Sequence, residues 1–274
     1  MSFDKETANE LVPSLQEVTE NYYKIKSLLK KTPVISWEGE LKDKILGSDA
    51  EIFIKLELLQ YAGSFKPRGG LTVSQVLSQD EKKNGLVTVS AGNHGISLAY
   101  IAKKIGAKAT VCLPASANPF RLQKIRELGA ETIICEDVHK AFEKAESLKQ
   151  EKGMFFFHPF EGYGMTLGHG SLALELVEQI PSGFDQIVIS VGGGGLCSGV
   201  AAGLKQHPLT VGTKIIAVEP EGADALHQSL KVDKTVRLDS RWREIQNLML
   251  TGYYLSPYKI SVVSYLRHAG YTPT

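Results

Sequence analysis

Lys66 stands in surroundings that favour a reactive amine. The run Gly63-Ser64-Phe65-Lys66-Pro67 places it after a small, flexible turn and an aromatic residue, and Pro67 is suited to the first turn of a helix. An amine held there can be partly desolvated and so become nucleophilic. Because most lysines are solvated surface charges, this run alone only marks Lys66 as a candidate.

Four successive glycines, Gly192, Gly193, Gly194 and Gly195, follow an apolar run and precede a helix-like segment that starts with Leu196. Backbone N–H groups of such a loop can approach an anion closely, and the helix N-terminus adds a favourable dipole. A plain tight turn is the alternative, but four glycines cost too much chain entropy for that. The Gly-x-Gly-x-x-Gly fingerprint fails, since Cys197 or Ser198 stands at its third glycine, and no Lys-Ser or Lys-Thr follows. We expect a cradle for one phosphate monoester.

A third loop, Ser90-Ala91-Gly92-Asn93-His94, also lies between an apolar run and a helical segment. Its backbone donors, hydroxyl and amide would sit where the carboxyl ends of strands converge, which suits a carboxylate or a ring hydroxyl. Ser-x-Gly-Asn is also a common loop composition. This motif gains weight only beside the other two.

The elements that position these loops read as an α/β fold. From about Ile52, short β-branched runs alternate with segments of helical apolar spacing, the pattern of parallel sheets covered on both faces. We expect two lobes, a large one from residues 1–60 and 165–274 and a small one from 61–164. The predicted strands are Ile52–Leu56, Val87–Ser90, Ala109–Leu113, Thr132–Cys135, Phe155–Phe157, Gln186–Val191 and Lys214–Val218.

Composition narrows the class of partner. The chain has 274 residues, 43% of them apolar, with 31 basic and 30 acidic side chains, so it carries no footprint for nucleic acid or an anionic membrane. Three scattered cysteines indicate reduced thiols without a disulfide framework or zinc site. Without a leader-like start or a long apolar run, the chain is expected to be cytoplasmic.

Taken together, the runs GSFKPRGG, SAGNHG and SVGGGGL resemble the fold type II pyridoxal-phosphate enzymes, in particular the serine/threonine dehydratase (threonine ammonia-lyase) and serine racemase group. The resemblance extends from about Thr32 to Ser240. It implies two open, mostly parallel sheets flanked by helices, as in the tryptophan synthase beta-like fold, with the cofactor between the lobes. It also implies a homodimer.

The resemblance assigns roles to the motifs. Lys66 would form the Schiff base with pyridoxal 5'-phosphate and later remove the substrate Cα proton, with Phe65 packed on the pyridine ring. Asn93 would bind the 3'-oxygen of the ring, and the run Gly192–Leu196 would hold the phosphate. The residues implied for the substrate are Ser64, Ser90, Ala91, Gly92 and His94.

The implied reaction is β-elimination of L-threonine or L-serine to a 2-oxo acid and ammonia. Serine racemases carry a serine at the position of Ala91, which would supply a proton on the second face of the cofactor, so elimination is favoured over racemisation. A third alternative is a catalytically defective homologue that still binds pyridoxal phosphate.

Several positions depart from the family pattern. His169 stands where the family typically has glutamine, and we interpret it as the cap of the following helix. Glu219 and Ala223 match two ligands of a family cation site, but Ala225 stands at the third, so no metal is expected. Residues 241–274 have an abrupt composition, lack the usual turn that contacts the pyridine nitrogen, and are interpreted as an altered C-terminus.

Overall fold

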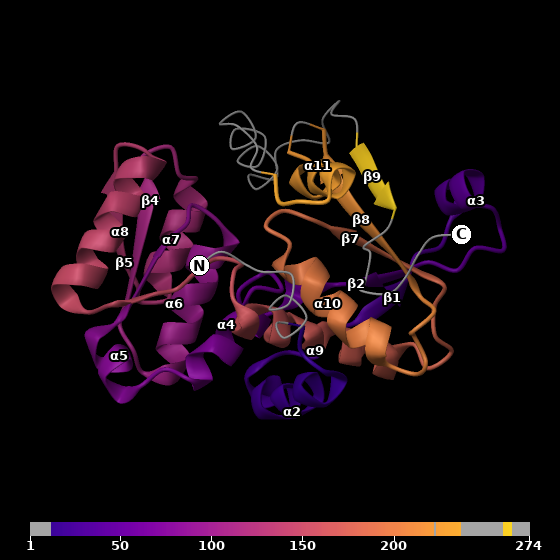
Figure 1. The fold of residues 1–274 in the computed structure, drawn as a ribbon, viewed down its shortest axis with the longest axis horizontal. Helices are drawn as coiled ribbons and strands as arrows, with labels where there is room; N and C mark the ends of the chain where they lie inside the picture. The colour runs from indigo at the N-terminus through magenta and orange to yellow at the C-terminus, as the bar shows by residue number, and fades with distance from the viewer. Residues whose placement is uncertain (1–11, 222, 237–259, 265–274) are drawn as a thin grey trace.

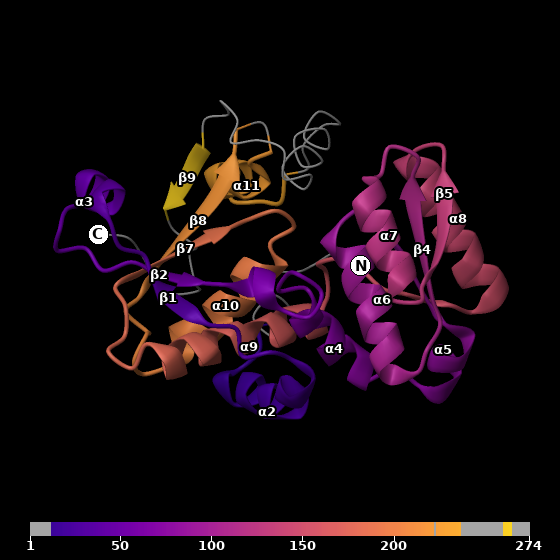
Figure 2. The same ribbon diagram turned by 180° about the vertical axis from the view of Figure 1, so that it is seen from behind.

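The computed structural model describes residues 12–221, 223–236 and 260–264. Figure 1 shows two lobes, one around β4, α6, α7 and α8 and the other around β7, β8, α10 and α11. Helices α4 (Pro67–Gln75) and α9 (Tyr163–Gln179) lie between them, and the view from behind in Figure 2 agrees.

The smaller lobe is built on a four-stranded parallel sheet in the order β5-β4-β3-β6. Apolar side chains of α6 and α7 pack on one face, around Leu98 and Ile125, while α8 covers the other face with Ala141 and Ala145. Every residue of β3 is buried, as expected for a strand covered on both faces. Its elements are β3 (Leu86–Val89), β4 (Ala109–Pro114), β5 (Glu131–Cys135), β6 (Phe155–Phe156), α5 (Gln79–Asn84), α6 (Asn93–Ile105), α7 (Pro119–Glu127) and α8 (Val138–Lys152).

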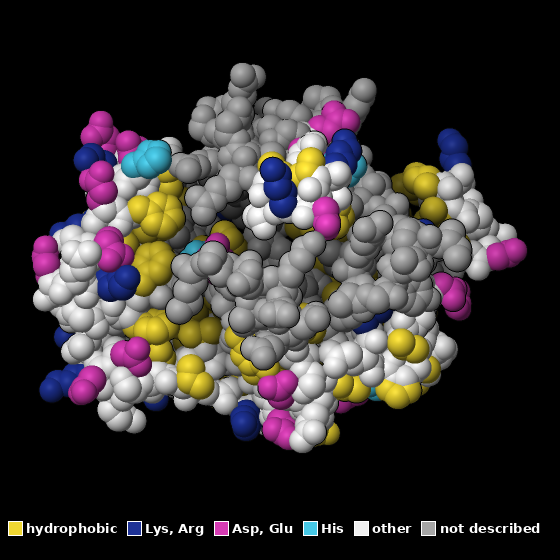
Figure 3. Space-filling model, viewed as in Figure 1, with side chains coloured by type: hydrophobic (Ala, Val, Ile, Leu, Met, Phe, Trp, Pro, Cys, Tyr) yellow, Lys and Arg dark blue, Asp and Glu magenta, His cyan; other side chains and the backbone are white. Residues whose placement is uncertain are grey.

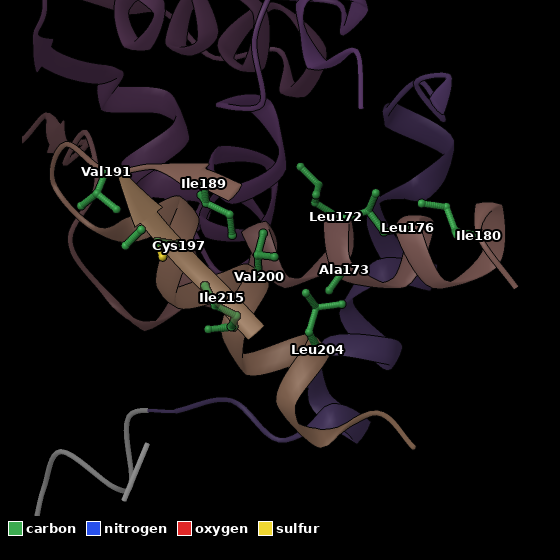
Figure 4. Packing of buried hydrophobic residues seen from close by; sticks show 12 residues of the cluster. Leu172, Ala173, Leu176, Ile180, Ile189, Val191, Cys197, Val200, Leu204 and Ile215 are labelled. Carbon is green, nitrogen blue, oxygen red and sulfur yellow. The ribbon is translucent and has the colours of Figure 1, made fainter. Parts of the chain in front are cut away.

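The larger lobe holds a three-stranded sheet in which β7 and β8 are parallel and β9 is antiparallel to β8. Figure 4 shows its core, where Leu176 of α9, Val200 and Leu204 of α10, and Ile189 and Ile215 of the sheet pack together. The elements are β7 (Gln186–Ser190), β8 (Lys214–Pro220), β9 (Ile260–Ser264), α2 (Leu15–Ile25), α10 (Gly195–Gln206) and α11 (Ala225–Val232).

A two-stranded antiparallel sheet precedes the junction between the lobes. From there α4 packs against both α9 and α6, and the contact with α9 is so close that a Cβ added to Gly168 would lie 2.3 Å from the Arg68 carbonyl oxygen. The helix that follows Lys66 is therefore fixed between the two lobes. The remaining elements are η1 (Lys26–Leu28), β1 (Val34–Ser36), α3 (Glu40–Leu46), β2 (Phe53–Lys55) and η2 (Glu57–Leu59).

All seven predicted strands are present, shifted by no more than a few residues at their ends, and the α/β fold class is confirmed. β1 and β9 were not predicted, and β9 falls in the segment set apart as atypical. The exact lobe boundaries stay a prediction. The three cysteines are free thiols, with Cys112 and Cys197 buried.

Acidic and basic side chains are intermixed over the face seen in Figure 3. Among the described residues, no helix combines the length and the apolar character needed to cross a membrane.

Candidate functional site

Lys66 is the residue directly before α4, and its amine is mostly withdrawn from water. Nζ donates a hydrogen bond of 2.7 Å to the Pro159 carbonyl oxygen, in the loop after β6. Burial lowers the pKa of this amine from 10.5 to about 8. The structure thus shows the desolvation that a nucleophilic lysine requires.

The four-glycine run forms the turn between β7 and α10. Gly194 has a φ of +83°, a left-handed conformation that favours glycine, and Gly195 is the first residue of α10. Gly192 and Gly193 are exposed. A ligand can therefore reach backbone N–H groups at the N-terminus of a twelve-residue helix, as expected of a phosphate cradle. Leu196 packs partly into the core below.

The third loop lies at the carboxyl end of β3. Ser90 Oγ accepts the Gly92 N–H at 3.1 Å, and Gly92 precedes the first residue of α6, Asn93. Asn93 and Ala91 are half-buried. The Asn93 amide makes no hydrogen bond to any residue that the structure describes, so it remains available to a ligand.

His94 of this loop is buried, and its Nε2 lies 3.1 Å from the Phe157 carbonyl oxygen. Because a carbonyl only accepts, Nε2 must carry the proton. Burial, with a smaller effect of the nearby Lys66 charge, lowers the His94 pKa to about 3. His94 is therefore a neutral side chain that ties the loop to the end of β6.

Sequence reasoning missed the segment that joins the three motifs, residues 157–160. Its Phe157 carbonyl binds His94, its Pro159 carbonyl binds Lys66, and the Phe160 ring lies against the glycine run, 2.3 Å from where a Cβ of Gly193 would be. The signal was present, since this segment directly follows a predicted strand, at the edge where the other loops lie.

Arg121, also not anticipated, lies beside the third loop. Its Nη1 is 3.2 Å from the position of an added Cβ on Gly92, and burial lowers its pKa. The guanidinium has no hydrogen-bond or ion-pair partner in the described ranges. It adds an unpaired positive charge next to the loop expected to bind a carboxylate.

Buried polar atoms without partners gather around Lys66. In the described part of the chain there are four, namely Ser64 Oγ, Ser97 Oγ and both ring nitrogens of His169. Ser64 is two residues before Lys66, and the His169 ring meets the Phe65 ring edge-on at 5.1 Å. Since buried polar atoms are normally hydrogen-bonded, three of these four mark a place built for a group other than protein. A phosphorylated aldehyde that reacts with the lysine fits these residues.

Two interpretations of single residues change. His169 does not cap a helix, because it lies in the middle of α9, fully buried. The Glu219 carboxylate accepts the backbone N–H groups of Leu226 and His227, at 3.0 and 2.9 Å, and so holds the start of α11. The described residues contain no cluster of three side chains able to bind a metal, and Glu219 with Ala223 stays a prediction as a cation site.

The fold and these loops define a pyridoxal-phosphate site, and comparison with known proteins supports this. Residues 25–272 match the family model described as pyridoxal-phosphate dependent enzyme, and the chain belongs to this family. A phenylserine dehydratase of Ralstonia pickettii is 35% identical over 238 residues, which are 87% of this chain and 71% of the relative. An L-threonine ammonia-lyase of Thermotoga maritima is 33% identical over 229 residues, 83% of this chain and 55% of the relative.

Solved structures agree. Maize serine racemase superimposes with a TM-score of 0.75 at 31% identity, covering 84% of this chain and 68% of its own. A bacterial threonine deaminase, from the source abbreviated T.th., also gives 0.75, at 34% identity, covering 83% and 72%. The predicted family, fold class, cofactor and dehydratase class are confirmed by these matches. The family match reaches residue 272, so it includes most of the segment interpreted as altered, while the chain spans about half the length of the threonine ammonia-lyase relative.

Proposed function

We propose that this protein catalyses the pyridoxal-phosphate-dependent β-elimination of L-threonine or L-serine to a 2-oxo acid and ammonia. The observation that carries the proposal is the Lys66 amine, whose pKa burial lowers to about 8. The Pro159 carbonyl holds it in the same loop whose Phe160 touches the phosphate cradle.

Each part of the site has a task in this reaction. The cradle Gly192–Gly195 would hold the phosphate, and Asn93 would bind the ring oxygen. The cofactor, once bound, supplies an electron sink next to the substrate Cα. Lys66 then takes the Cα proton, because an amine with a pKa near 8 is unprotonated in part at neutral pH and is a competent base. The β-hydroxyl departs as water after protonation, and hydrolysis of the released enamine gives the 2-oxo acid and ammonia.

The substrate class follows from charge and from the relatives. The loop Ser90–His94 presents backbone donors for a carboxylate, and the unpaired Arg121 guanidinium lies beside it. The two relatives described above are named for phenylserine and threonine, which are both β-hydroxy amino acids. This supports a small amino acid with a β-hydroxyl group as the substrate.

Serine racemisation is the competing function, because serine racemases are among the solved structures that superimpose on the chain. Ala91 argues against it, since a methyl group cannot deliver a proton to the second face of the cofactor. A defective homologue that binds the cofactor without turnover is the remaining alternative.

One experiment separates these functions. Purified protein with pyridoxal phosphate is incubated with L-threonine and L-serine, and 2-oxo acid and D-serine are followed together with the absorption band of the lysine-bound cofactor. We expect 2-oxo acid, little D-serine, and loss of the band in Lys66→Ala. A wild-type protein with the band but without 2-oxo acid would contradict the proposal, and a band that survives Lys66→Ala would contradict the assignment of the lysine.

We also propose that the enzyme is cytoplasmic and forms a homodimer. The balanced charge and free thiols of the chain support the first proposal, and the family resemblance supports the second. Light scattering of the purified holoenzyme at several concentrations tests the dimer, and fractionation of cells tests the location.

A further inference from the structure

His169 is the most unusual buried group outside the motifs. It lies in the middle of α9 with no exposed surface, and neither ring nitrogen has a hydrogen-bond partner in the described ranges. An unpaired buried polar group costs roughly 1 to 3 kcal/mol, so such a group is retained where it does something beyond filling space. The roles given above to the site do not use it.

The ring is wedged between the parts of the site. A Cβ added to Gly69 of α4 would lie 2.9 Å from Nε2, and one added to Gly195 of α10 would lie 3.6 Å from Nδ1. The Phe65 ring meets the imidazole edge-on, at 5.1 Å and 71°. His169 is thus in contact with the lysine helix, the aromatic residue next to Lys66 and the first residue of the cradle helix.

The charge state of the ring is also fixed. Burial, followed by the positive charge of Lys66, lowers the pKa of His169 to about 3, and the Gly195 carbonyl opposes this only weakly because its contact lacks hydrogen-bond geometry. The imidazole is therefore neutral, with one N–H donor and one acceptor. A neutral donor close to a helix N-terminus can assist an anion without adding a competing cation.

We propose that His169 is a positioning residue for the phosphate cradle. Its polar edge holds the first turn of α10 in place against Phe65 and α4, so that loss of this edge weakens binding of the cofactor's phosphate and leaves the condensation of its aldehyde with Lys66 unchanged. The proposal rests on the cofactor of the proposed function but not on turnover.

The alternative is that His169 only fills the core. The two roles differ in their dependence on the phosphate, since a packing defect changes the affinity for any pyridoxal compound, whereas a displaced cradle affects only phosphorylated ones. Glutamine keeps one neutral donor and one acceptor, while phenylalanine keeps a ring and removes both. These two substitutions therefore separate polarity from volume.

The test compares wild type, His169→Gln, His169→Phe and the control Ser97→Ala, which removes another buried hydroxyl without a partner. Affinities for pyridoxal phosphate and for pyridoxal are measured from the absorption band of the lysine-bound compound. We expect His169→Phe to bind pyridoxal phosphate about tenfold more weakly, the size of one hydrogen bond. Its affinity for pyridoxal should change by less than about twofold, and His169→Gln and Ser97→Ala should resemble wild type.

A second measurement uses neither aldehyde nor substrate. In a Lys66→Ala background, inorganic phosphate should raise the melting temperature, and His169→Phe should reduce this shift. Equal weakening of both pyridoxal compounds, no change in either, or failure of His169→Gln to restore binding would each overturn the proposal. If the wild-type protein converts no amino acid but shows the expected binding pattern, the proposed function fails and the role of His169 stands.

Discussion

At the scale of single residues, Lys66 is distinguished by burial. Its folded pKa of about 8 lies below the ordinary 10.5, so the folded apoprotein binds fewer protons than the unfolded chain between these values. The cost of burying the charge is therefore fully present below pH 8 and is relieved as the pH rises toward 10.5.

A reactivity measurement checks this. In the apoprotein, modification of Lys66 by an amine reagent should rise with a midpoint near pH 8. The exposed Lys140, whose pKa its ion pair with Glu143 raises, should be modified at a higher pH. Equal pH profiles for the two lysines, determined by peptide mapping, would show that Lys66 is not desolvated in solution.

Gly193 gives a steric prediction at the same scale. A methyl group there would lie 2.3 Å from the Phe160 ring, so Gly193→Ala must displace the loop that also carries the Lys66 partner Pro159. We expect the affinity for pyridoxal phosphate to fall at least about tenfold, which is roughly 1.4 kcal/mol. Gly212→Ala, where an added methyl meets nothing within 4 Å, is the matched control. Restored affinity in Gly193→Ala with Phe160→Ala would identify the ring as the obstacle.

At the scale of elements, a buried ion network fixes the lysine helix. Arg68 of α4 is fully buried and binds both Glu57, at 2.7 Å, and Glu175 of α9, at 2.8 Å. Lys55 of β2 reaches the same Glu175 at 2.6 Å. Burial alone would lower the pKa of Arg68, but its two carboxylate partners raise it overall. Four charges that nearly cancel thus join three elements close to the site.

Breaking this network should be costly. Arg68→Met leaves two buried carboxylates with only one cation, and we expect a loss of roughly 3 to 5 kcal/mol in the free energy of unfolding, measured in urea. Lys31→Met removes an exposed pair with Glu178 and should cost less than about 1 kcal/mol. Similar costs for both would mean that the network adds nothing beyond surface pairing. Arg68→Lys, which keeps a charge, should fall between the two.

Local sequence was sufficient for most elements and insufficient for their contacts. The strand before each functional loop was predictable because a buried parallel strand is a continuous apolar run between turn residues, as in Leu86–Val89. The strand Val34–Ser36 was not, because three half-exposed residues carry no readable period. The glycine run and Lys66 could be assigned from composition. Phe160 and Arg121 could not, since their closeness to Gly193 and Gly92 comes from tertiary packing across the lobes' loops.

At the scale of the whole molecule, two buried histidines link the site to acid stability. The pKa values of His94 and His169 are both lowered from 6.5 to about 3, mainly by burial. Between these values the unfolded chain binds protons that the folded chain does not, so the stabilisation from keeping these rings neutral is present above pH 6.5 and is lost as the pH falls toward 3. Each histidine contributes a slope of about 1.4 kcal/mol per pH unit, or roughly 2 kcal/mol between neutral pH and pH 5.

This slope can be measured and divided. The free energy of unfolding of the apoprotein in urea should fall by roughly 4 kcal/mol from pH 7 to pH 5, and His169→Gln should remove about half of that fall. His139→Gln, at an exposed position, should leave the fall unchanged. A fall that is the same in His169→Gln as in wild type would show that this histidine is protonated without unfolding, and its ring would then not be the neutral support that the cradle requires. Acid stability and phosphate affinity are therefore expected to change together at His169, because both depend on one buried imidazole.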